Sequence, residues 1–61
     1  MKRVLCNATI EEFPDGSLEV TVEGVGDFNG NMRVYHLDER DPDRAAREGI
    51  RLFVEEMGGE L

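Results

Sequence analysis

The stretch ATIEEFPDGSLEVTV, residues 8–22, decides the fold of this 61-residue chain. Apolar and polar residues alternate in 8–12 and again in 18–22, and this period-2 pattern predicts two strands that each bury one face. Between the strands, Pro14 suits the second position of a type I turn. Gly16 can adopt the left-handed conformation of the bulge that follows such a turn. The stretch therefore predicts a β-hairpin.

A three-residue loop, 14–16, sets the register of this hairpin. It places Ile10 opposite Val20, so that the apolar faces of the two strands coincide, whereas a four-residue loop would break the pattern. The same register sets Glu11 beside Glu19, and this pair of like charges costs a few tenths of a kcal/mol or more. The hairpin is therefore expected to have one apolar face and one acidic face.

The segment MRVYHL, residues 32–37, reads as a third strand. It follows Asn29-Gly30, the pair typical of a two-residue type I′ turn, which predicts a second hairpin. With that turn, Tyr35 and Leu37 point toward the buried face. The three strands then form an antiparallel meander.

The two-residue turn also predicts an apolar patch on the opposite face of the sheet. Val34 would lie there beside Val25 and Leu5, and His36 would lie on the same face opposite Glu23. A bulge at one of the glycines before the turn would instead turn Met32, Val34 and His36 inward, and the sequence leaves this alternative open.

A helix is expected from Pro42 to about Met57. Asp41 can cap it, proline suits the first helical position, and Gly58-Gly59 can end it. At about 100° per residue, one stripe should pack on the sheet: Ala46, Gly49, Ile50, Phe53 and Met57. The predicted fold is thus α+β, a single domain over 1–61 with a three-stranded antiparallel meander and one C-terminal helix on one face.

Composition restricts the function. Fourteen acidic against seven basic residues give a formal charge of −7, which disfavours direct contact with nucleic acid or anionic lipid and favours basic partner surfaces. Cys6 is the single cysteine, so no internal disulfide forms, and it is interpreted as a core residue. No apolar run approaches the ~18 residues of a membrane span. A cytoplasmic location is expected. The many acidic residues and the scarcity of lysine are interpreted as the mark of a GC-rich genome, with adaptation to high salt as the alternative.

The stretch YHLDERDPDR, residues 35–44, is the main candidate for a metal or acid–base site. Counted from Asp38, it lacks the glycine and glutamate of a calcium loop, and a zinc site would need more histidine or cysteine ligands. His36 and Asp38 lie two residues apart on one strand face but lack a nucleophile. The stretch is interpreted as a strand end, a turn and a helix cap. We expect no enzyme, metal or cofactor, with acid–base catalysis by His36 as the minor alternative.

The β-β-β-α order, with DPDRAAREGIRLFVEEM as its helix, resembles the N-terminal domain of HicB-type antitoxins over roughly residues 8–57. The glycine motif flanked by proline, expected after the second strand, is lacking. In size and charge, the chain is also similar as a class to small acidic phage inhibitors such as anti-CRISPR proteins. These resemblances imply an inhibitor or antitoxin-like role.

The function predicted from the sequence is that of a non-enzymatic acidic interaction protein. It would cover the basic surface of a nuclease, toxin or defence complex without binding nucleic acid or membrane itself. Five acidic residues of the first hairpin would form the partner-binding surface by imitating a row of phosphates: Glu11, Glu12, Asp15, Glu19 and Glu23. The alternative is a structural homodimer or assembly subunit that buries Leu5, Val25 and Val34 or pairs an open sheet edge.

Overall fold

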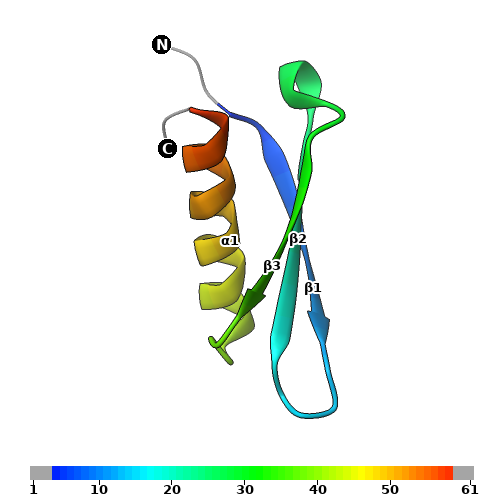
Figure 1. Cartoon of the computed structure of the whole chain (residues 1–61), viewed down its shortest axis with the longest axis vertical. Helices are drawn as coiled ribbons and strands as arrows, with labels where there is room; N and C mark the ends of the chain where they lie inside the picture. Colours follow the sequence, from blue (N-terminus) through cyan, green and yellow to red (C-terminus); the bar gives the residue numbers. More distant parts are fainter. Residues whose placement is uncertain (1–3, 59–61) are drawn as a thin grey trace.

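The computed structural model describes residues 4–58, which form a sheet covered on one face by a helix (Figure 1). The elements in chain order are β1 (Cys6–Glu12), β2 (Leu18–Gly24), the 3₁₀ helix η1 (Gly26–Phe28), β3 (Met32–Leu37) and α1 (Pro42–Met57). The strands are antiparallel in the order β1-β2-β3. This arrangement confirms the predicted α+β fold and its β-β-β-α order.

The first hairpin has the predicted register. Ile10 pairs with Val20, and the Phe13 amide donates to the Ser17 carbonyl at 3.0 Å, which closes the three-residue loop. Gly16 has a φ of +89°, the left-handed conformation that the loop requires. The local turn chemistry of residues 13–17 therefore fixes which face of β1 and β2 is buried.

The core lies between β2 and α1. Its fully or almost fully buried members are Leu18, Val20, Val22, Ala45 and Phe53. Burying a side chain such as Val20 or Phe53 contributes roughly 1.5–3 kcal/mol. Gly49 brings the two layers together, because a Cβ atom at this position would lie only 2.6 Å from Val20 Cγ1.

Both ends of α1 are capped as predicted. The Asp41 carboxylate accepts a hydrogen bond from the Asp43 amide at 3.0 Å, and Pro42 is the first helical residue. At the other end, Gly58 has a φ of +75° and its amide donates to the Glu55 carbonyl at 3.1 Å. These caps satisfy backbone groups that helix termini otherwise leave unpaired.

The buried stripe of α1 differs from the predicted one at its first residue. Ala45 is fully buried, whereas Ala46 is only half-buried. Gly49 and Phe53 are buried as predicted, and Val54 is buried beside them. The contact line follows the i, i+4, i+8 ridge through Ala45, Gly49 and Phe53, because the two small residues allow close approach to β2. Met57, also assigned to the stripe, continues this ridge and is half-buried against the core, and Ile50 is half-buried beside the ridge.

The second hairpin does not have the predicted two-residue turn. Residues 25–31 form a longer connection in which η1 is followed by a hydrogen bond from the Asn31 amide to the Phe28 carbonyl at 3.2 Å. That carbonyl oxygen lies only 2.2 Å from where a Cβ of Gly24 would be, so the connection requires glycine there. Tyr35 pairs with Val20, four residues along β2 from the expected partner.

A shift of four residues leaves each side chain of β3 on its predicted face, since side chains alternate with a period of two. Tyr35 and Leu37 face α1, and both pack against the core. Met32, Val34 and His36 face away from the helix, so the bulge that would have turned them inward does not occur. The observed register therefore changes only which side chains of β2 and β3 are neighbours across the strands.

Candidate functional site

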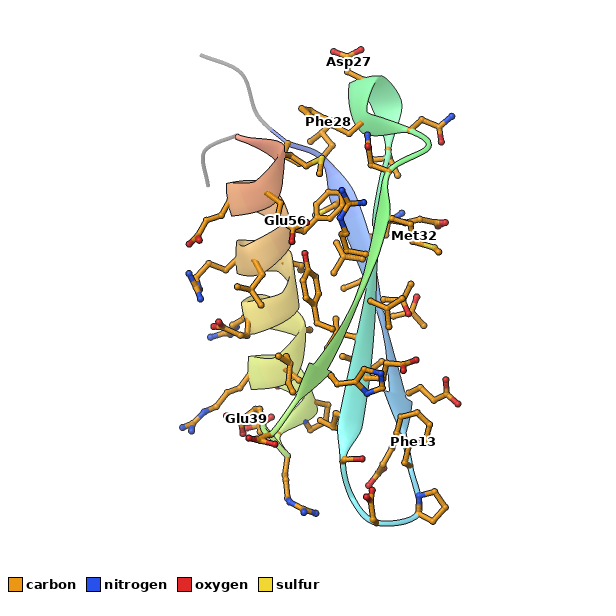
Figure 2. All side chains as sticks on the ribbon, in the orientation of Figure 1. Phe13, Asp27, Phe28, Met32, Glu39 and Glu56 are labelled. Atoms are coloured by element: carbon orange, nitrogen blue, oxygen red, sulfur yellow. The ribbon has the colours of Figure 1, made fainter. Side chains whose placement is uncertain are left out.

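The sheet face that points away from α1 is the candidate interaction surface, and we call it the outer face. The strand registers place eleven side chains there: Leu5, Asn7, Thr9, Glu11, Glu19, Thr21, Glu23, Val25, Met32, Val34 and His36. Figure 2 shows Met32 and Phe13 on this side, whereas Glu56 points from α1 toward the sheet. The outer face carries no lysine or arginine among residues 4–58.

The five acidic residues predicted to act together do not form one row. Glu11, Glu19 and Glu23 lie on the outer face, and Glu11 is directly opposite Glu19 as expected. Glu12 pairs with Leu18, which places its side chain on the helix-facing side at the exposed end of β1. Asp15 lies in the turn beyond the strands. The structure therefore brings three of the five together.

Glu19 is held by its neighbours more tightly than the other two carboxylates of the outer face. Its side chain is only 21% exposed, and His36 Nε2 lies 2.9 Å from its carboxylate. The imidazole of His36 stacks on the ring of Phe13, with centroids 6.4 Å apart and planes inclined by 13°. His36 was expected opposite Glu23, but the observed register sets it opposite Glu19. Sequence reasoning missed this cluster because it depends on the register of β3.

Asp15 is engaged within its own turn. Its carboxylate accepts hydrogen bonds from the Ser17 hydroxyl at 2.7 Å and from the Ser17 amide at 2.9 Å. These bonds lower the pKa of Asp15, desolvation opposes them, and the nearby Arg40 guanidinium adds a smaller further decrease. Arg40 also donates to the Asp15 carbonyl at 3.0 Å. The Asp15 carboxylate therefore stabilises its own turn, and the Arg40 guanidinium already lies near it.

The predicted apolar patch is divided by the observed register. Leu5 and Val25 remain neighbours, because the Val25 amide donates to the Leu5 carbonyl at 2.9 Å. Val34 pairs with Thr21 instead of Val25, so it lies apart from them. The missed apolar member is Met32, which is 54% exposed next to Val34 at 46%. The exposed apolar side chains of β3 thus form a pair of their own.

Behind β3, polar side chains connect the sheet to α1. Arg33 Nε donates to the Glu56 carboxylate at 2.8 Å. The Tyr35 hydroxyl is enclosed close to the Glu56 carboxylate, and no atom of residues 4–58 forms a well-aligned hydrogen bond with it. Burial raises the pKa of Tyr35, the Glu56 carboxylate raises it further, and Arg33 opposes the change. A polar group in this position is costly unless a partner reaches it.

The opposite side of α1 carries mixed charge. Arg51 bonds both Glu48 and Glu55, and Arg44 lies 4.0 Å from the Asp41 carboxylate. A shallow groove on this side is lined by Glu39, Arg44, Arg47, Glu48 and Arg51. The ion pairs of Arg51 raise its own pKa and lower that of Glu48. Attraction and repulsion are therefore largely balanced within the helix surface.

Cys6 is half-buried and packs against the core, as interpreted from the sequence. Burial raises the pKa of its thiol, which disfavours the reactive thiolate. Within residues 4–58, no three His, Cys, Asp or Glu side chains are grouped closely enough to hold a metal ion. No helix in the same residues is both long and apolar enough to cross a bilayer.

Comparison with protein-family models, with curated proteins and with solved structures gave no match to this chain. The geometry and charge of the outer face and of the strand edges are therefore the features that bear on function.

Proposed function

We propose that this chain is a non-enzymatic, inhibitor or antitoxin-like protein. Its outer face would cover a basic surface on a nuclease, toxin or defence complex that handles nucleic acid. The observation that carries the proposal is the segregation of charge along the chain. Residues 4–32 contain six carboxylates and no lysine, arginine or histidine, whereas the described arginines all lie between Arg33 and Arg51.

The fold turns this segregation in sequence into a segregation in space. Glu11, Glu19 and Glu23 share the outer face with neutral Asn7, Thr9 and Thr21. Asp27 adds a carboxylate in η1, beyond the ends of the strands (Figure 2). A basic surface approaching the outer face meets carboxylates and neutral side chains, because no described residue of this face is a lysine or arginine. Such complementarity increases the association rate and discriminates against wrong partners.

The sheet also holds these carboxylates in place before a partner binds. Glu11 and Glu23 project from paired strands, so that little backbone freedom is lost on association. Exposed carboxylates contribute little to the stability of the chain itself. They remain available for paired hydrogen bonds from the guanidinium groups of a partner. The paired Glu19 adds charge to the same surface, although its carboxylate already contacts His36.

A matched pair of double variants tests the proposal. Glu11→Lys with Glu23→Lys reverses two charges on the outer face, while Asp43→Lys with Glu55→Lys makes the same change in net charge on α1. All four side chains are exposed, so both variants should keep the fold, which circular dichroism can confirm. Each protein would be used to capture partners from a lysate of the native host.

We expect a nucleic-acid-handling protein to bind the wild type and the Asp43 and Glu55 variant but not the outer-face variant. Its affinity for the wild type, measured by calorimetry, should fall steeply as salt rises, because exposed charges carry the attraction. Equal binding of all three proteins at every salt concentration would eliminate the acidic outer face as the interface.

A further inference from the structure

β3 is one of the two edges of the sheet, and β1 is the other. None of its six residues is buried, and α1 packs chiefly over β1 and β2. The Gly24 amide donates to the Asn31 carbonyl at 2.8 Å, which fixes the alternation of hydrogen bonds between β2 and β3. Arg33, Tyr35 and Leu37 consequently direct their backbone groups toward β2. Met32, Val34 and His36 direct theirs toward solvent.

This edge lacks most of the features by which proteins prevent strand pairing, which include proline, lysine and inward-facing charge. Residues 31–37 contain neither proline, lysine nor an acidic residue, although the chain as a whole carries −7. The inward-facing charge of Arg33 is compensated by Glu56 at 2.8 Å. Arg33 Nη1 also donates to the Met32 carbonyl at 2.8 Å, and that oxygen can accept a second bond.

We propose that two copies of the chain pair through β3 in antiparallel orientation, centred on Val34, to form a continuous six-stranded sheet. In this register Val34 lies opposite Val34 of the second copy, and Met32 lies opposite His36 of the second copy. The two exposed apolar residues of the strand, Met32 and Val34, then become members of cross-strand pairs. The arrangement has twofold symmetry, which is the commonest form of protein dimer.

On the helix-facing side of the sheet, the same register places Arg33 opposite Tyr35 of the second copy. The twofold axis is perpendicular to the sheet, which places both α1 helices on one face and both outer faces on the other. This dimer does not depend on the function proposed above.

Electrostatic repulsion between the copies is smaller along this edge than along β1. The six acidic residues of 4–32 lie on β1, β2 and their connections, so β3 separates them from the second copy. With strands about 4.8 Å apart, the two β2 strands of the dimer would be separated by roughly 14 Å. That distance exceeds the screening length of about 8 Å at physiological salt. Pairing through β1 would instead bring the two acidic hairpins together.

Disulfide trapping tests the register. In a Cys6→Ala background, Val34→Cys places two thiols on strands whose opposed Cα atoms are about 5.5 Å apart, within the range that a disulfide spans. Met32→Cys is the matched control, because it lies on the same face of β3 with similar exposure. Its counterpart in the second copy lies four residues along, roughly 13 Å away.

Under mild oxidation, the Val34→Cys protein should form covalent dimer at least about tenfold faster than the Met32→Cys protein. The Met32→Cys and His36→Cys double variant should recover rapid cross-linking, because these positions are opposed in the proposed register. Equal rates for the two single variants would overturn the proposal.

The oligomeric state provides a second test. Sedimentation equilibrium of the wild type should give a mass approaching twice the 6.9 kDa of one chain as concentration rises. Val34→Lys should weaken association at least about tenfold by placing two like charges face to face. Leu5→Lys is the control, because Leu5 is 55% exposed but lies beyond the start of β1. Melting curves verify that both variants fold.

A wild type that remains monomeric at about 1 mM would overturn the inference, since that concentration corresponds to association weaker than about 4 kcal/mol. The same conclusion follows if Leu5→Lys weakens association as much as Val34→Lys does. Either result can be obtained whether or not the acidic outer face binds a partner, so the two proposals fail independently.

Discussion

Gly49→Ala should destabilise the protein even though alanine is the better helix former. In an exposed helix, replacing glycine by alanine stabilises by about 1 kcal/mol. Here the added methyl carbon would lie 2.6 Å from Val20 Cγ1 and 3.1 Å from Val20 Cβ. Val20 is fully buried on the central strand, and as a β-branched residue it has few alternative rotamers. The helix must therefore move away from the sheet.

The expected size of the effect follows from these two opposing contributions. Overpacking a core costs about 1–3 kcal/mol, and the rigid contact with Val20 places Gly49→Ala near the upper end of that range. After subtracting about 1 kcal/mol for helix propensity, the net loss is about 2 kcal/mol. A domain of this size has a stability of roughly 3–9 kcal/mol, so the loss is a large fraction of the total.

Urea denaturation followed by circular dichroism measures the loss. At an m-value of about 1 kcal/mol per molar, the midpoint should fall by roughly 2 M without a change in slope. In a Val20→Ala background, where Cγ1 is absent, the cost of Gly49→Ala should fall by at least about 1 kcal/mol. A rise in the midpoint of the single variant, or strict additivity in the double variant, would refute the close contact between α1 and β2.

Three further predictions concern the caps and charges. Asp41→Ala should lower the free energy of unfolding by about 1 kcal/mol, because its carboxylate caps α1, and an unchanged urea midpoint would contradict this. Ser17→Ala should raise the pKa of Asp15 toward its ordinary value in a carbon-13 NMR titration, because the hydrogen bond from the Ser17 hydroxyl makes the largest contribution to lowering that pKa. Since folding lowers this pKa, the stabilisation from Asp15 is present at neutral pH and is lost as pH falls through the lowered value. Glu11→Lys should stabilise the protein by about 0.2–1 kcal/mol through its pair with Glu19. Glu19→Lys should not stabilise it, because this change also removes the contact with His36. Equal melting temperatures for these two variants would contradict the prediction.

The parts of the fold that sequence reasoning predicted correctly are those encoded within a few residues. The turn at 13–17 specifies its own loop length, and the loop length specifies the pairing of β1 with β2. The ends of α1 were equally accessible, since Asp41, Pro42 and Gly58 each act on the adjacent turn of helix. Choosing between Ala45 and Ala46 was harder, because both are small and adjacent, and only the position of β2 decides which is buried.

The second hairpin shows where local reasoning fails. Asn29-Gly30 is a strong turn signal, yet a register shift of four residues preserves the apolar face of β3 and cannot be detected from alternation. The register that forms depends on the space beside the Cα atom of Gly24, which the Phe28 carbonyl occupies. Because the predicted register of β3 was wrong, the predicted neighbours in the candidate site were wrong as well. The observed register pairs His36 with Glu19 and separates Val34 from Val25.

The thinness of the molecule has a consequence for the rate at which it meets a partner. Its smaller dimensions are 19 and 14 Å, so the outer face and the arginine-bearing side of α1 are separated by more than the screening length of about 8 Å at physiological salt. In dilute salt, an approaching cationic surface is attracted by the total charge from any direction. At physiological salt it is attracted mainly by the nearer side, so encounters through the sheet are selected over encounters through the helix. Raising the ionic strength should therefore lower the association rate and also increase the share of encounters that occur through the sheet.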